Sequence, residues 1–318
     1  MVSVSADLIR SAHVRVPAAF RDSPQFVSEP LSERLGVPVV VKVETANPIG
    51  CFKGPGTWLA VAELRAAGRV GERRGVVVAS AGNFGQGVAY AGRAMGISVM
   101  VFAAHTANRA KVAAMRRLGA DVRLVGEDFD AAREAASACA GEMGWELMVD
   151  GADPWIAIGA GSLACELTDA VAAGVLPVLA AVYVPVGNGA LIGGVGVWLR
   201  QAAPMTLVIG VQATGAPAMT LSWRARRPIE TERVDTIADG IAARVPVTEA
   251  LSLMLDVVDD MLLVDDPSIM TATAELSAAL PLAIEPSAGA AWAAALQRPQ
   301  TSAIALILTG GNVTSADP

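Results

Sequence analysis

The sequence has few charged and few aromatic residues. Of its 318 residues 17% are charged, and the aromatic residues are 6 Trp, 6 Phe and 2 Tyr. Because 53% of the residues are hydrophobic, the chain is not intrinsically disordered, and its core must consist mainly of small aliphatic side chains. A chain of this length predicts one large domain or two smaller ones.

Cysteine and histidine are scarce. Cys51, Cys139 and Cys165 are odd in number and far apart, which excludes a disulfide framework and a zinc site of C-x-x-C type. The histidines are His13 and His105, which excludes a His-rich metal site. We therefore expect no metal ion and a reducing, cytoplasmic compartment.

Basic clusters and long hydrophobic runs are also missing. The net charge is −7 and no strongly basic patch occurs, so we expect no nucleic-acid partner. The longest apolar runs, such as 176–186, are shorter than the ~20 residues of a spanning helix. The first residues show no basic segment followed by an apolar one, so we expect neither a signal peptide nor a membrane partner.

Apolar runs alternate with helical patterns from residue 75 onward. This alternation predicts βαβ units, and strands that are apolar throughout are typical of a parallel sheet covered on both faces. The polar stretch 224–239 is expected to be an exposed excursion. The expected strands are 75–79, 97–102, 122–125, 147–149, 180–186, 207–211 and 303–308.

A glycine-rich turn follows the strand expected at 180–186. Its amides would point from a helix N-terminus and could hold a phosphate. Gly187, Gly189 and Gly193 also approximate the dinucleotide fingerprint, but the acidic residue expected about 20 positions later is Gln212. A tight turn without a ligand remains an alternative.

Three further segments have both a structural and a chemical interpretation. Lys53 lies in a turn rich in Gly and Pro, before a helix expected to begin near Thr57. It is either a solvated surface charge or a lysine whose apolar neighbours favour the neutral amine that Schiff-base chemistry needs. Ser80 or Asn83 could cap a helix or help to bind a carboxylate. Segment 308–312 could be an ordinary turn after a strand.

Taken together and in this order, the segments resemble the fold-type II pyridoxal 5'-phosphate (PLP) enzymes, in particular the serine/threonine dehydratase and serine racemase family. The similarity extends over essentially the whole chain. Its motifs are 47–53, 80–86, 159–162, 185–191, 236–240, 285–289 and 309–312.

The resemblance implies a two-domain α/β fold with parallel-rich twisted sheets and helices on both faces. Residues 1–74 and 151–318 would form the large PLP-binding domain. Residues 75–150 would form a small α/β domain that closes over the substrate. It also implies a homodimer.

The resemblance further implies that PLP is the cofactor and that Lys53 forms a Schiff base with it. Catalytic roles are implied for Lys53, Ser80 and Asn83. The implied cofactor contacts are Phe52 beside the ring, Asn83 at its hydroxyl, Gly187, Asn188, Gly189, Ala190 and Leu191 at the phosphate, Thr309 at the pyridine nitrogen, and Gly240 and Glu285 near the ring. The implied substrate pocket consists of Ser80, Ala81, Gly82, Asn83 and Phe84.

The sequence departs from the family pattern at three places. Phe84 stands where members usually have His, which predicts a less polar pocket. Ala81 stands where racemases place a serine, which argues against racemisation. Gln212 and Ala218 replace the acidic ligands of members that bind a divalent cation.

The expected activity is that of a PLP-dependent ammonia-lyase. Lys53 would remove the Cα proton of a β-hydroxy or similarly activated amino acid, and loss of the β-substituent, assisted by the PLP phosphate or Lys53, would give a 2-oxo acid and ammonia. β-Replacement or racemisation on the same scaffold is the alternative, and a dinucleotide-binding oxidoreductase is a remote one. Only residues 313–318 follow Asn312, so we expect no appended regulatory domain.

Overall fold

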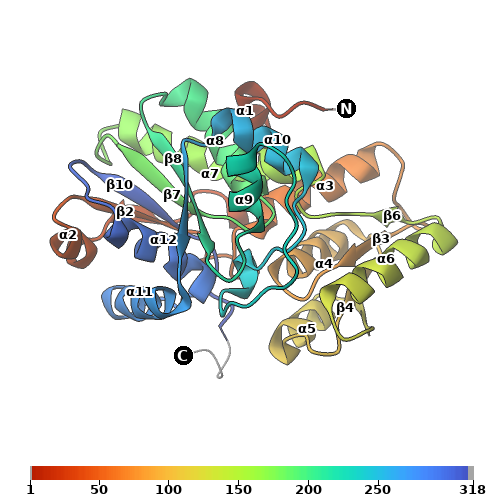
Figure 1. Cartoon of the computed structure of the whole chain (residues 1–318). Coiled ribbons are helices and arrows are strands. Elements are labelled where there is room, and N and C mark those ends of the chain that lie inside the picture. The colour runs from red at the N-terminus through yellow and green to blue at the C-terminus, as the bar shows by residue number, and fades with distance from the viewer. Residues whose placement is uncertain (1, 314–318) are drawn as a thin grey trace.

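The structure, a computed structural model, describes residues 2–313 and contains two β-sheets. The larger sheet has six strands in the order β1-β2-β10-β7-β8-β9, and only β1 runs antiparallel to its neighbour (Figure 1). Its strands are β1 (Gln25–Val27), β2 (Val39–Val43), β7 (Ala181–Pro185), β8 (Leu207–Ala213), β9 (Asp260–Val264) and β10 (Ile304–Leu308).

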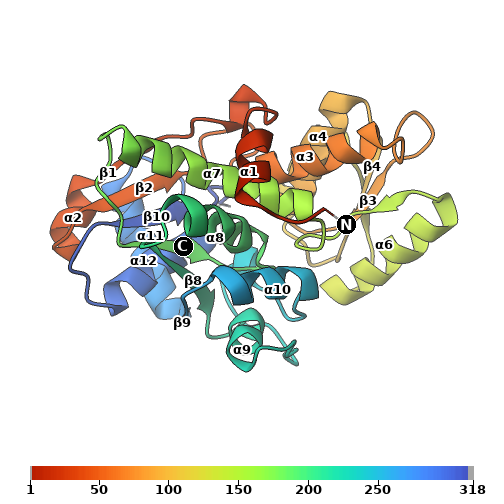
Figure 2. The ribbon, with the colours of Figure 1, turned by 90° about the horizontal axis from the view of Figure 1, so that it is seen from above.

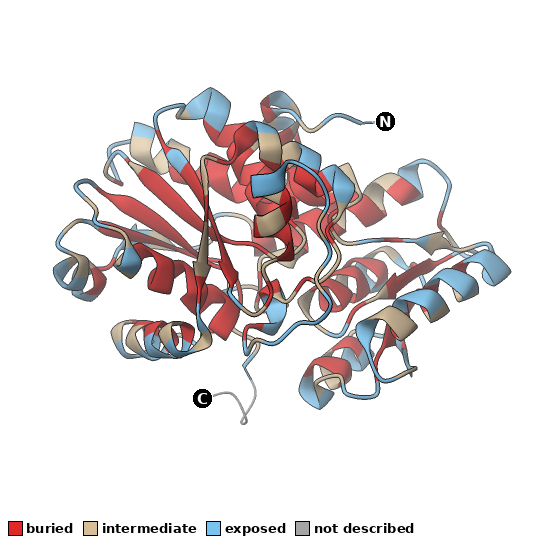
Figure 3. Cartoon of the chain, in the orientation of Figure 1, coloured by how far each residue is buried: buried red, intermediate tan, exposed pale blue. Residues whose placement is uncertain are grey.

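Helices cover both faces of this sheet, and its central strands are buried (Figure 3). One face packs on α1 (Ala6–His13), α7 (Pro154–Ala172), α8 (Ala190–Ala202) and α10 (Thr248–Val257). The other packs on α2 (Glu29–Leu35), α11 (Asp266–Ala279) and α12 (Pro286–Gln297). Alternate residues of one strand serve opposite layers: Val40 joins the first core, and Val41 joins the second. The remaining helices are α9 (Ala218–Ala225) and the 3-10 helices Ala18–Phe20 and Asp239–Ile241. Met219 and Phe20 join the first core, and Ile241 joins the second.

The smaller sheet has four parallel strands in the order β5-β4-β3-β6. They are β3 (Val76–Ala79), β4 (Val99–Ala103), β5 (Asp121–Leu124) and β6 (Glu146–Leu147). One face packs on α3 (Lys53–Ala66), α4 (Asn83–Met95) and α5 (Arg109–Arg117), and the other on α6 (Phe129–Met143). The view from above shows this sheet beside the larger one (Figure 2).

The predicted α/β fold with parallel-rich sheets and helices on both faces is confirmed. The expected strands are present within one or two residues, although β6 is shorter than 147–149. The sequence analysis missed β1, β2 and β9, and it placed Lys53 before its helix. Lys53 is instead the first residue of α3, because Pro55 is tolerated in a first helical turn, where amides have no partner within the helix.

Helix α7 packs between α3 and α8. Glycines let its backbone touch α3 on one side and α8 on the other: a Cβ atom on Gly159 would lie 2.5 Å from Gly56 Cα, and one on Gly194 would lie 2.0 Å from Ala157 O. By length and composition alone α7 could cross a membrane, but most of its residues are buried between these helices. It is therefore a core helix.

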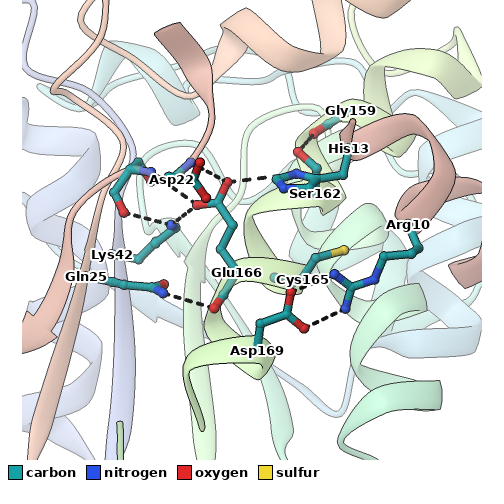
Figure 4. Close-up of polar contacts among 12 residues, drawn as sticks. Arg10, His13, Asp22, Gln25, Lys42, Gly159, Ser162, Cys165, Glu166 and Asp169 are labelled. Atoms are coloured by element: carbon teal, nitrogen blue, oxygen red, sulfur yellow. Dashed lines mark hydrogen bonds and ion pairs between the residues drawn. The ribbon is translucent and has the colours of Figure 1, made fainter. Parts of the chain in front are cut away.

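A buried polar network ties α7 to the first strands (Figure 4). Lys42 on β2 is fully buried, forms an ion pair with Glu166 on α7 and donates to Ser23 O at 3.1 Å. Burial raises the pKa of the neighbouring Glu44 carboxyl. His13, Asp22 and Glu166 approach closely enough to hold a metal ion, but Lys42 already provides a cation at Glu166. We therefore interpret the network as structural.

The backbone contact between α7 and α8 predicts a stability effect. A methyl group in Gly194→Ala would meet the rigid carbonyl of Ala157, and overpacking of this kind costs ~1–3 kcal/mol. We expect the free energy of unfolding, measured in urea, to fall by about that amount. The control Gly141→Ala adds a methyl group in open space on α6, so it should leave stability unchanged or raise it by ~0.5–1 kcal/mol. Equal effects of the two substitutions would contradict this account of the packing.

Candidate active site

Three neighbouring strands bring the predicted segments together. In the larger sheet β2, β10 and β7 are adjacent and parallel, so their carboxyl ends lie at the same edge. The chain leaves β2 toward Lys53, leaves β10 at Thr309 and leaves β7 into the loop 186–189. This edge is where open α/β sheets bind their ligands.

Lys53 begins α3 and lies beside two aromatic rings. Its Nζ is 4.6 Å from the centroid of the Phe52 ring and 5.8 Å from that of the Phe84 ring. The same atom donates to Asp150 Oδ2 at 2.7 Å, and the two side chains are only 13% and 16% exposed. Lys53 is thus not a solvated surface charge. The sequence analysis missed Asp150.

The glycine-rich loop joins β7 to α8 as predicted. Gly189 has a φ of +93° and is the N-cap of α8, whose first amides have no acceptor within the helix. Gly187 is packed so closely that a Cβ atom would lie 2.9 Å from Gly240 O, which places the predicted Gly240 beside the loop. Asn188 Nδ2 donates to Asp150 Oδ2 at 3.3 Å. The loop therefore adjoins Lys53 through Asp150.

The asparagine loop connects β3 with α4. Ser80 Oγ accepts hydrogen bonds from the amides of Gly82 and Gly85 at 3.2 and 2.9 Å, so Ser80 supports the start of α4. Its hydroxyl hydrogen remains available as a donor. Asn83 donates to Glu285 at 3.0 Å and accepts from Asn312 Nδ2 at 2.8 Å. These contacts connect the smaller sheet with the residues that follow β10.

Residues after β10 complete this arrangement. Thr309 is buried, and its carbonyl accepts from the amide of Phe52 at 3.0 Å. The Gly310 carbonyl accepts from the amide of Glu285 at 2.9 Å. A Cβ atom on Gly310 would lie 2.0 Å from Glu285 Oε2, so only a glycine lets the two segments approach this closely.

A second lysine connects the two sheets. Lys111 on α5 is buried, and its Nζ lies 2.6 Å from Asp239 and 3.5 Å from Glu285. Although burial alone would lower the pKa of Lys111, the two carboxylates outweigh it and raise the pKa. Burial raises the pKa of the Glu285 carboxyl despite this cation. Lys111 is therefore committed to an ion pair.

A cavity of about 450 Å³ opens beside the asparagine loop, lined by residues that include Ala81, Asn108 and Asp239. Ala81 is exposed, and a methyl group is its whole side chain. Phe84 is buried in the core of the smaller sheet while its ring faces Lys53 Nζ. It thus packs against its own sheet and borders the site.

Gln212 stands where cation-binding members of the family have an acidic ligand. Its side chain is fully buried and is not among the contacts that surround Lys53. Its Oε1 accepts from both the amide and the hydroxyl of Thr220, at 2.7 and 2.9 Å. The oxygen that a cation would need is therefore already bonded twice.

The residues at the sheet edge fit PLP. A paired lysine amine faces two aromatic rings, and a helix N-terminus with a left-handed glycine lies next to it. One carboxylate oxygen, Asp150 Oδ1, is buried without a hydrogen-bond partner among residues 2–313. A site with such a polar atom and such free amides is suited to a polar ligand.

The sequence profile of the family described as "Pyridoxal-phosphate dependent enzyme" matches residues 17–310. The chain belongs to this family. The resemblance inferred from the motifs is confirmed, and PLP is the cofactor.

The chain is similar over most of its length to proteins of this family. An L-threonine ammonia-lyase of Geobacter sulfurreducens is 32% identical over 309 residues, which are 96% of this chain and 75% of that protein. The structure of threonine deaminase isoform 2 from Solanum lycopersicum matches with a TM-score of 0.87 and 29% identity over 99% of this chain and 87% of that chain. Maize serine racemase matches with a TM-score of 0.91 and 25% identity over 99% and 95%.

The conformation of the glycine loop predicts that Gly189 is needed for PLP binding. Gly189→Val places a β-branched side chain at a φ of +93° and 2.7 Å from Met254 Sδ, which would displace the first amides of α8. We expect the apparent affinity for PLP, measured by equilibrium dialysis, to fall at least about tenfold.

The matched control is Gly144→Val, which is also at positive φ but points into open space at the end of α6. It should bear the backbone strain and retain PLP. Normal PLP content in Gly189→Val would refute the assignment of this loop.

Proposed function

We propose that the protein is an ammonia-lyase that converts a β-hydroxy or similarly activated amino acid into a 2-oxo acid and ammonia. The observation that carries the proposal is the arrangement of Lys53 beside the glycine loop at the edge of the larger sheet, where Asn83 of the asparagine loop contacts Glu285 and Asn312. The similarity to threonine ammonia-lyase and threonine deaminase supports β-elimination as the reaction.

The cofactor would be held by the residues at the sheet edge. The amides of 187–191 would bind its phosphate, and Lys53 would carry the Schiff base. Thr309 would face the pyridine nitrogen, and Phe52 would lie beside the ring. The ring hydroxyl would accept from Asn83, with Gly240 and Glu285 nearby. When bound, PLP supplies an electron sink for the pair left when the Cα–H bond breaks.

The substrate would bind at the asparagine loop. The hydroxyl of Ser80 and the amides at the start of α4 are suited to a carboxylate, because a helix N-terminus favours an anion. The cavity lined by Ala81 and Asn108 adjoins this loop. Residues 75–150 would close over the substrate, and the ion pair of Lys111 with Asp239, which links α5 to the large domain, supports this role.

Elimination is favoured over racemisation by the residues near Lys53. Lys53 Nζ would accept the Cα proton from one face of the substrate. Racemisation needs a second group that delivers a proton to the other face, and Ala81 has no hydroxyl to do so. The solved racemase that the fold resembles does not alter this argument, since it concerns side chains rather than fold.

We further propose a cytoplasmic homodimer. The free cysteines Cys51, Cys139 and Cys165 support a reducing compartment. The dimer rests on the family resemblance, and sedimentation equilibrium of the purified protein tests it.

The central experiment combines trapping of the lysine with a substrate screen. Borohydride reduction of the PLP-loaded protein and peptide mapping should label Lys53. Candidate amino acids should release 2-oxo acid and ammonia in equal amounts. Lys42 and Lys111 serve as internal controls, since both are buried in ion pairs. A label on either of them, or no 2-oxo acid from any β-hydroxy or β-chloro amino acid, would overturn the proposal.

Phe84 predicts the substrate preference. An apolar ring near Lys53 disfavours small, strongly polar side chains relative to bulkier ones by ~1–3 kcal/mol. In Phe84→His we expect the ratio of kcat/KM for serine to that for larger β-hydroxy amino acids to rise by about tenfold or more. An unchanged ratio would show that Phe84 acts only in the core. Racemisation at a rate near that of elimination would contradict the argument that no side chain delivers a proton to the face opposite Lys53.

A further inference from the structure

The carboxylate of Asp150 lies at the reacting amine, and neither the motifs nor the fold assigns it a role. It belongs to the loop between β6 and α7, and its Oδ2 accepts from Lys53 Nζ at 2.7 Å and from Asn188 Nδ2 at 3.3 Å. Its Oδ1 is buried and has no hydrogen-bond partner within residues 2–313. One oxygen is thus bonded to the lysine, and the other is free.

This arrangement differs from the other buried ion pairs of the molecule. Lys42 and Lys111 are paired with carboxylates and take no part in the proposed chemistry. Lys53 instead changes its number of protons during the reaction, because it would accept the Cα proton. The distance of 2.7 Å to Asp150 is within the range of direct proton transfer.

β-Elimination also requires a proton at a second place. A hydroxide ion is a poor leaving group, so the departing oxygen must receive a proton as the Cβ–O bond breaks. Lys53 could give that proton itself only by moving from Cα to the β-substituent. A carboxyl group fixed beside Lys53 removes the need for that movement.

Building on the proposed function, we propose that Asp150 is a further catalytic residue, the acid that carries the proton from Lys53 to the leaving group. The Cα–H bond breaks and its proton goes to Lys53 Nζ. Lys53 passes a proton to the Asp150 carboxylate. The Cβ–O bond breaks as the Cα–Cβ double bond forms, and the oxygen takes its bonding pair and the proton of Asp150 to leave as water. Lys53 and Asp150 end with the protons they began with.

The leaving group provides the test. Chloride departs without a proton, whereas hydroxide does not. In Asp150→Asn we expect kcat/KM for the β-hydroxy amino acid that the wild type prefers to fall at least about 100-fold. For the β-chloro analogue of that amino acid it should stay within about threefold of the wild type, which also shows that the variant is folded and loaded with PLP.

Asp153→Asn is the matched control, because it makes the same change in the same loop. Asp153 is the N-cap of α7 and accepts from the amide of Trp155, and asparagine serves equally well at this position. It should leave both activities unchanged.

A second measurement needs no catalysis. In the cofactor-free protein the pairing with Asp150 protects Lys53 Nζ, so an amine-reactive acylating reagent followed by peptide mapping should label Lys53 at least about threefold faster in Asp150→Asn. The Asp153→Asn protein should be labelled like the wild type. Equal labelling in all three proteins would show that the pair does not form in solution and would overturn the proposal.

The remaining outcomes are distinct. An equal loss with the hydroxy and chloro substrates would make Asp150 a positioning residue for Lys53 and refute the proton relay. Full activity of Asp150→Asn with the hydroxy substrate would refute any catalytic role. If the wild type releases no 2-oxo acid from either substrate, the elimination itself is wrong, and the relay is lost with it.

Discussion

The contact of α7 with α3 and α8 is the constraint on which the site depends. Because Gly159 and Gly194 bring backbones together, no side chain can adjust the distances between these helices. Lys53 is the first residue of α3, and Gly189 caps α8. The packing of three helices therefore fixes the reactive amine relative to the loop that would hold the phosphate. A site built in this way is positioned before any ligand binds, which is what catalysis by orientation requires.

Much of the fold could be predicted from the sequence because its signals are local. From residue 75 onward, apolar strands alternate with helical periodicity, and this pattern needs no knowledge of distant contacts. The same holds for the glycine turn after β7, whose conformation depends on a few neighbouring residues. The strand β2 (Val39–Val43) was missed because it lies before residue 75, outside the stretch in which apolar runs alternate with helical patterns.

The site was predicted less completely, because its polar contacts join residues far apart in the chain. The motifs located Lys53, Asn83 and Thr309, but nothing in the neighbourhood of Asp150 or Lys111 indicates their partners. Asp150 lies 97 residues from its lysine, and Lys111 lies 128 residues from Asp239. Local patterns carry no information on such pairs, which arise only when the two sheets are placed side by side.

The buried lysines differ in whether they keep their charge during the proposed reaction. An ion pair out of water is retained when both partners keep their charges, because removing one leaves the other uncompensated. Lys42 and Lys111 satisfy this condition: the pair with Glu166 joins β2 to α7, and the pair with Asp239 joins α5 to the 3-10 helix Asp239–Ile241. Lys53 differs from them, because its amine gains and loses a proton in the proposed reaction. Asp150 Oδ2 lies 2.7 Å from that amine. Asp150 is therefore placed to exchange a proton with Lys53, which is the step that the proposed relay requires.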